Sequence, residues 1–167
     1  MTHTTKRWGS RPPDVANLFN PAFCALLLNR LAAGYNSKAT MKLPYVLPFL
    51  AIPILLHPPS TSQLPKTSRT SFHGWLLEHP TLLVGFSDRA TELVSVVREA
   101  LAFGLAHNLL MLDNQGRIAV NGPAKNIRHW EQSDYNNRHS KDAQLLGKLL
   151  AQVEDVTTIF ALFGIRP

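Results

Sequence analysis

The fold is decided by residues 43–75, which read LPYVLPFLAIPILLHPPSTSQLPKTSRTSFHGW. The first part, residues 43–56, carries no charged side chain and contains Pro44, Pro48 and Pro53. A membrane span needs roughly 20 apolar residues, so this run is too short to cross a bilayer. It is also too apolar for a water-exposed surface. We therefore expect it to be buried, either in the core of this chain or against a partner.

The prolines predict the local structure of this stretch. An interior proline removes a helical hydrogen bond at a cost of about 3 kcal/mol, so a kinked or twice-started helix is expected up to His57. The Pro-, Ser- and Thr-rich residues 58–67 predict a loop. Residues 68–78 predict a short helix that presents Phe72 and Trp75 on one side.

Outside this stretch, capping residues and apolar spacing predict four more helices. They begin after Asn20, Ser87, Ser140 and Asp155, and the first and last end at Gly34 and Gly164. Residues 109–112 and 117–120 flank the turn DNQG and predict a β-hairpin. Helix, helix and hairpin follow one another in the order of a winged helix-turn-helix. We therefore expect a mostly α-helical fold with a winged-helix-like β-hairpin.

The chain has 167 residues, of which 45% are hydrophobic, and this is enough for one domain with a real core. We expect residues 1–16 to form a flexible basic arm. Residues 17–167 are expected to form a single mainly helical domain, with a loose loop at about 121–139. The apolar run at residues 22–28 begins too late and is too short for a signal peptide.

A single cysteine, Cys24, excludes an internal disulfide framework and a multi-cysteine zinc site. The chain also lacks the phosphate-loop, dinucleotide-binding, nucleophile-elbow and H-E-x-x-H motifs. The seven histidines are scattered, and no spacing places two of them together on one helical face. We therefore expect no enzyme activity, no catalytic residues, no cofactor and no bound metal, and a reducing cytoplasmic location.

Positive charge is concentrated in the first part of the chain. Residues 1–73 carry eight Lys or Arg and one acid, a net charge of +7, whereas residues 74–167 carry nine bases and ten acids, a net charge of −1. The bases Lys38, Lys42, Lys66 and Arg69 flank the apolar stretch without acids nearby in the sequence. They are predicted to meet acidic groups of a partner protein or DNA phosphates. The alternative, that they only solvate the surface, stays open.

A winged helix can bind DNA by placing the helix before the hairpin in the major groove. Residues 88–108 offer Arg89, Arg98 and Asn108 for this purpose, but a similar number of acids would repel phosphate: Asp88, Glu92 and Glu99. This balance favours a protein-docking module. A winged-helix DNA-binding regulator remains the alternative.

The apolar stretches together exceed what we expect one small domain to bury. The last helix adds Phe160 and Phe163 to residues 43–56 and to the first helix. We therefore predict a permanent partner that covers part of this apolar surface, with Phe160 and Phe163 among the contacts.

Three stretches resemble a known family: FNPAFCALLL (19–28), LPFLAIPILLHPPSTSQLPKTSRTSFHGWL (47–76) and TTIFALFGIRP (157–167). They are similar to the middle component of bacterial three-component ABC-ATPase systems of the SMC-like, Lamassu type. The similarity extends from about Val15 to Pro167. The resemblance implies an accessory subunit that couples a DNA-sensing SMC-like ATPase to an effector, a nuclease or other toxin, in anti-phage or anti-plasmid defence. It transfers no catalytic residue, and it implies contact with DNA through the complex.

Overall fold

The structure is a computed structural model that describes residues 12–13, 19–120 and 125–165. Most of the described chain is helical, as the sequence predicts. The elements are α2 (Pro21–Asn36), α3 (Pro48–Leu55), α4 (Pro58–Thr61), α5 (Phe72–Glu78), the 3₁₀ helix η2 (Pro80–Leu83), α6 (Phe86–Glu92), α7 (Val94–Ala106), β1 (Leu110–Leu112), β2 (Ile118–Val120), α8 (Lys125–Trp130), α9 (Asp134–Leu150) and α10 (Val156–Leu162). Nearly all of the predicted basic arm, residues 1–16, lies outside the described residues.

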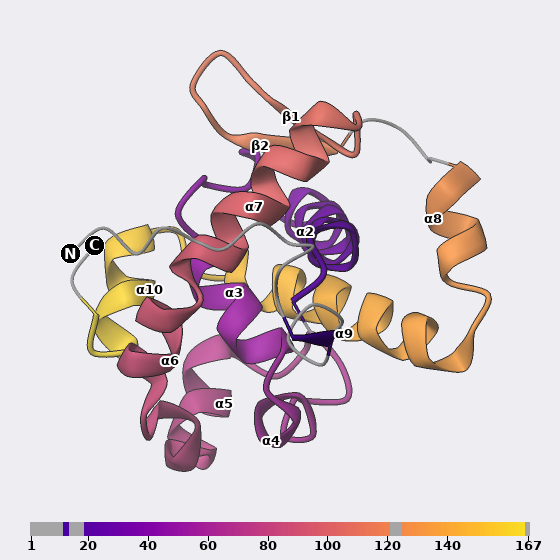
Figure 1. The fold of residues 1–167 in the computed structure, drawn as a ribbon. Helices are drawn as coiled ribbons and strands as arrows, with labels where there is room; N and C mark the ends of the chain where they lie inside the picture. The colour runs from indigo at the N-terminus through magenta and orange to yellow at the C-terminus, as the bar shows by residue number, and fades with distance from the viewer. Residues whose placement is uncertain (1–11, 14–18, 121–124, 166–167) are drawn as a thin grey trace, which may run out of the picture.

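Helix α2 lies at the centre of the molecule, and α7 and α9 pack against it (Figure 1). Asn20 caps its start as predicted, because its side-chain oxygen accepts hydrogen bonds from the backbone N–H groups of Ala22 and Phe23. The predicted end at Gly34 is wrong, since the helix continues to Asn36. A Cβ at Gly34 would overlap the backbone carbonyl of Gln144 in α9. This glycine therefore allows two helices to approach closely and does not end one.

A second glycine lies on the other side of the same helix contact. A Cβ at Gly147 of α9 would overlap the backbone carbonyl of Leu31 in α2. Each helix thus brings a residue without a side chain to the point where it meets its neighbour. From the sequence, Gly147 was expected only to destabilise its helix, by about 1 kcal/mol relative to alanine.

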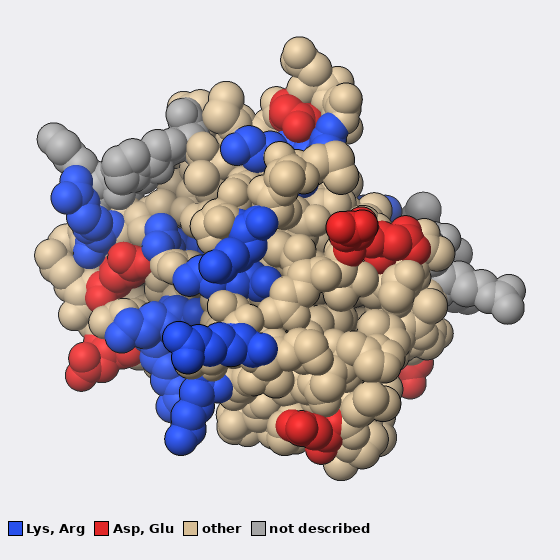
Figure 2. Space-filling view, turned by 180° about the vertical axis from the view of Figure 1, so that it is seen from behind, with Lys and Arg blue, Asp and Glu red and all other residues tan. Residues whose placement is uncertain are grey.

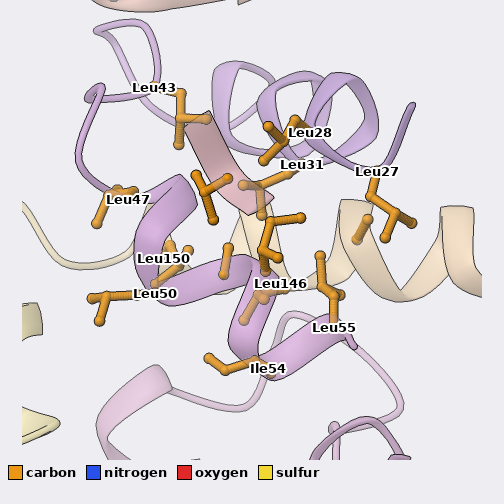
Figure 3. Close-up of a cluster of buried hydrophobic side chains, with 14 of the residues drawn as sticks. Leu27, Leu28, Leu31, Leu43, Leu47, Leu50, Ile54, Leu55, Leu146 and Leu150 are labelled. Carbon is orange, nitrogen blue, oxygen red and sulfur yellow. The ribbon is translucent and has the colours of Figure 1, made fainter. Parts of the chain in front are cut away.

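The apolar stretch forms the middle of the core, as Figure 3 shows. A turn begins at Pro44, and α3 starts again at Pro48 and contains Pro53, which agrees with the predicted twice-started helix. The side chains of this stretch contact leucines of α2 and α9: Leu43, Leu47, Leu50, Ile54 and Leu55 lie with Leu27, Leu28, Leu31, Leu146 and Leu150. Residues 43–56 are therefore buried largely within this chain.

The predicted hairpin is confirmed, with β1 and β2 paired antiparallel and Met111 opposite Ala119. Gly116 supplies the left-handed turn conformation, at φ 72°. Leu43 forms a bridge to Ile118 on the other side of β2. The likeness to a winged helix is not confirmed, and α7, the helix before the hairpin, buries Val97 and Leu101 in the core.

The helix predicted after Ser87 is in fact two helices, because the chain turns at Leu93 between α6 and α7. Ser87 lies inside α6, which follows Gly85 in a left-handed conformation at φ 63°. The prediction for the last helix is confirmed. Asp155 caps α10, and Gly164 ends it at φ 68°, with the N–H of Ile165 donating to the carbonyl of Phe160 at 3.0 Å.

The loop predicted at about 121–139 is wrong for the residues that the structure describes. Residues 125–130 form α8, and α9 begins at Asp134, capped by Ser133, whose hydroxyl accepts from the N–H of Asn136 at 3.2 Å. Ser140, the predicted cap, is buried inside α9, and its hydroxyl donates to Glu131. The first turns of α9 are polar in sequence, but contacts with α2 supply their apolar packing.

Candidate partner interface

The four predicted contact bases are all exposed: Lys38, Lys42, Lys66 and Arg69. In the described residues two ion pairs are present, Arg30 with Glu131 at 3.1 Å and Arg117 with Asp113 at 3.5 Å. None of the four predicted bases takes part in either pair. An exposed cation without an ion pair can bind an acid of a partner, and no ion pair within this chain has to break first. These four bases therefore meet the first requirement for an interface.

The backbone just before Lys38 lies against the residue that precedes Lys148, although the two lysines are far apart in sequence. Lys38 follows the end of α2, and its N–H donates to the carbonyl of Tyr35 at 3.0 Å. The backbone of Tyr35 contacts Gly147 of α9, and Lys148 is the next residue. The close approach of the two helices therefore places two lysines over the same end of α9.

Gln152 brings Arg69 to this end of α9. The side-chain nitrogen of Gln152 donates to the carbonyls of Ser68 and Thr70 at 2.8 and 3.2 Å. Its side-chain oxygen accepts from the N–H of Phe72 at 2.8 Å. The side chain of Gln152, just after the end of α9, thus fixes the backbone on both sides of Arg69.

Lys141 lies on the same side of α9 as Lys148, since residues seven apart share one side of a helix, and it extends the row of bases along that helix. We call Lys38, Arg69, Lys141 and Lys148 the basic face. Figure 2, which views the molecule from behind, shows Lys and Arg side chains gathered in one area with acidic groups toward its margins. Such a concentration of one charge attracts acidic partners and speeds their association.

The two other predicted bases, Lys42 and Lys66, each share their surroundings with an acid. Lys42 precedes Leu43, and its charge helps to lower the pKa of Asp113 in the hairpin, an effect due mainly to the hydrogen bond from the N–H of Arg117. Lys66 lines a shallow hollow together with Thr70 and Glu78, so an acid shares its surroundings. Two of the four predicted bases therefore belong to the basic face, and the contact of all four with a partner stays a prediction.

The sequence prediction missed Lys141 and Lys148. The net charge of residues 74–167 is close to zero, which concealed a local excess of bases. A signal was present, because the two lysines recur at a spacing of seven on the side of α9 opposite Ala143, Leu146 and Leu150. Both lysines lay inside the helix predicted after Ser140, but the bases were assessed by the charge of each half of the chain and not by helix face.

The other two predicted contacts, Phe160 and Phe163, are not on the surface. Their exposed fractions are 6% and 5%, and the ring of Phe163 lies 4.4 Å from that of Phe86. They pack in the core of this chain, so the structure corrects their assignment as partner contacts. The apolar side chains that do reach the surface lie elsewhere: Met41, Tyr45, Val46, Leu77, Leu83, Val84, Met111, Leu112 and Tyr135.

The described residues contain no group of three or more His, Cys, Asp or Glu side chains that could hold a metal ion. Cys24 is fully buried in α2. Burial raises the pKa of its thiol to about 12, and the charge of Glu99 adds to the effect. The thiol is therefore protonated at neutral pH, whereas a reactive cysteine needs the thiolate.

The family of the chain follows from a model that matches residues 8–167, described as ABC-three component (ABC-3C) system Middle Component 3. The chain belongs to this family. No curated protein and no solved structure matches it. Within the described residues, no helix has both the length and the apolar character required to cross a membrane.

Proposed function

We propose that this middle component is a non-enzymatic accessory subunit in the cytoplasm that joins an SMC-like ABC ATPase to an effector, a nuclease or other toxin. In this role it transmits the detection of foreign DNA by the ATPase to the effector, in anti-phage or anti-plasmid defence. The basic face carries the contact with an acidic surface of the ATPase or with the DNA that the ATPase holds.

The observation that supports this proposal most is the basic face itself. It gathers four bases from three separate segments: Lys38, Arg69 and Lys141 are exposed and Lys148 is partly exposed. None of them is in an ion pair with a described residue. Membership in a family of middle components supplies the context, because such a component is one part of a multi-component system. A charged surface that steers a partner into place suits a subunit whose task is assembly.

The alternative, a winged-helix regulator, requires bases or amides on the free side of α7. The exposed residues of that helix are Arg98, Ala102 and Ala106. Alanine cannot form the hydrogen bonds by which base edges are read in the major groove. The basic face lies on α9 and its neighbours, so the distribution of charge favours the accessory role.

The test is co-purification of the tagged chain with the ATPase and effector of the same system, with and without nuclease treatment. The double variant Arg69→Glu/Lys148→Glu reverses two charges of the basic face. We expect it to reduce the recovered ATPase at least about tenfold, since unlike charges become like charges at the contact. Loss on nuclease treatment would identify DNA as the contact, and persistence would identify the ATPase surface.

The matched control is Arg98→Glu/Arg128→Glu, which reverses two exposed charges outside the basic face. It should co-purify like the wild type. Equal loss in both variants would mean that only net charge matters, and no recovery of the ATPase with the wild type would refute the accessory role. The chain alone should hydrolyse no ATP, and turnover of about 1 per second, typical of enzymes, would refute the non-enzymatic assignment.

A further inference from the structure

A hollow of about 530 Å³ opens between the start of α2, the end of α3, α4 and the first half of α9. Its volume lies in the range of small-molecule sites. The side chains that matter for its chemistry come from α2, α3 and α9: Phe23, Leu55, Tyr135, Arg138, His139 and Asp142. Its floor adjoins the core through Leu55, and the accessory role makes no use of it.

One wall of the hollow is aromatic. The ring of Phe23 stacks on that of Tyr135 at 6.3 Å and 28°, and it meets the edge of His139 at 5.6 Å. Tyr135 and His139 are themselves in contact at 4.4 Å. Tyr135 is nevertheless 63% exposed, although it belongs to this cluster. A large aromatic ring that is fixed on one side and open on the other is a platform on which a second flat ring can stack.

Polar groups of both signs stand beside this platform. Arg138 and Asp142 lie one turn apart on α9 and both line the hollow. Partial burial raises the pKa of the Asp142 carboxyl, although Arg138 and His139 act in the opposite direction. The hollow therefore offers a cation and a carboxyl within one helical turn. A carboxylate accepts hydrogen bonds from amino groups and repels phosphate.

The cation side of the hollow continues into the basic face. Arg138, Lys141 and Lys148 follow one side of α9 over about 15 Å, at 1.5 Å per residue. None of the three is in an ion pair with a described residue. The row therefore begins at the aromatic platform and leads away from it along the helix.

We propose that the hollow binds one nucleotide of a single-stranded nucleic acid. The base stacks on Tyr135, and the phosphates follow Arg138, Lys141 and Lys148. Adenine, guanine and cytosine can in addition donate from their exocyclic amino group to Asp142, whereas stacking alone serves thymine or uracil. Stacking combined with a basic track is how proteins bind single strands without reading sequence. An acidic peptide would use the same bases but would gain nothing from Asp142 or from an open aromatic face.

This site does not depend on the accessory role, although it shares two lysines with the basic face. The test uses the full chain and fluorescence anisotropy with three probes: a labelled single-stranded 12-mer, the same sequence as a duplex, and free mononucleotides as competitors. The single strand should bind more tightly than the duplex, whose bases are stacked inside. Competition by mononucleotides at micromolar concentration would assign the site to free nucleotides, and lack of competition would assign it to the chain form.

Two variants and their controls isolate the site. Tyr135→Ala should weaken binding of the single strand roughly tenfold, as expected for the loss of one stacked base. Arg138→Gln should weaken binding and make it less sensitive to salt, because one phosphate contact is lost. The controls, Tyr45→Ala and Arg128→Gln, change exposed residues outside the hollow and should bind as the wild type does.

Melting curves followed by circular dichroism show whether Tyr135→Ala is folded, and Arg138→Gln tests the site independently because Arg138 is exposed. Three results would overturn the proposal: no binding of the single strand, equal binding of single strand and duplex with no effect of Tyr135→Ala, or equal loss in the control variants. The co-purification experiment can succeed or fail regardless of these results, so the two proposals are distinguishable.

Discussion

At the scale of single residues, the absence of a side chain at Gly34 and Gly147 determines how α2 and α9 meet. Alanine is the better helix former by about 1 kcal/mol, so a helix considered alone would gain from either substitution. In this fold the added methyl group would overlap backbone, which cannot move without separating the helices. We expect Gly34→Ala and Gly147→Ala each to lower the free energy of unfolding by about 1–3 kcal/mol, measured by chemical denaturation.

Gly104→Ala is the control for this prediction. Its added methyl group would meet the side-chain end of Leu110, which can rotate away, and not a backbone group. Gly104→Ala should therefore lower stability less than the other two. If all three variants unfold at the same denaturant concentration, the close approach of α2 and α9 does not carry the cost assigned to it.

At the scale of elements, the start of α9 distinguishes the structure from the sequence prediction. The structure places the cap at Ser133, whereas the sequence predicted it at Ser140. Ser133→Ala should therefore lower the free energy of unfolding by about 0.5–2 kcal/mol. It should also speed hydrogen exchange in the first turn of α9. Exchange at Asn136 and Asn137 measures this directly, because their N–H groups donate to the side chain and the carbonyl of Ser133. Fast exchange there already in the wild type would show that α9 begins later and that the sequence prediction was the better one.

The elements that the sequence predicted well are those with local signals. Asn20 with Pro21, the turn at Gly116, and Asp155 with Gly164 each fix an end of an element through their own backbone geometry. The errors arose where a distant segment decides the outcome. The beginning of α9 is polar, and its apolar contact is Phe23 of α2, which no local pattern reveals.

The candidate interface likewise has features that are visible in the local sequence and features that depend on distant segments. Isolated bases were recognisable from sequence, and Lys38 and Arg69 do belong to the basic face. Their grouping with Lys148 depends on the contact of α2 with α9 and on the hydrogen bonds of Gln152. Phe160 and Phe163 were assigned to a partner because apolarity in a sequence does not say which molecule covers it.

At the scale of the whole molecule, the core accounts for most of the apolar surplus that the sequence suggested would need a partner. Residues 43–56, α2 and α10 meet in one cluster of buried side chains. We therefore expect Phe160→Asp to unfold the chain, because it buries a carboxylate without a counter-charge, and not to release a partner from an intact fold. Circular dichroism should show loss of helix, and size-exclusion chromatography with light scattering should show aggregation.

Met111→Asp is the matched control, since it introduces the same charge at an apolar residue that is 46% exposed on the hairpin. Its stability should stay within about 0.5 kcal/mol of the wild type. A well-folded, monomeric Phe160→Asp variant would mean that Phe160 is not held in the core in solution, and its assignment to a partner interface would have to be reconsidered.

The three hydrogen bonds of Gln152 have a consequence for recognition at Arg69. A base on a free loop must lose the disorder of its backbone when a partner binds, and ordering each residue costs about 1–2 kcal/mol. The backbone groups of Ser68, Thr70 and Phe72 are already held by one side chain following α9. Much of that entropy is therefore lost during folding and does not have to be lost again on binding. A single amide makes Arg69 a preorganised contact, so that a partner meets a surface whose shape is set before it arrives.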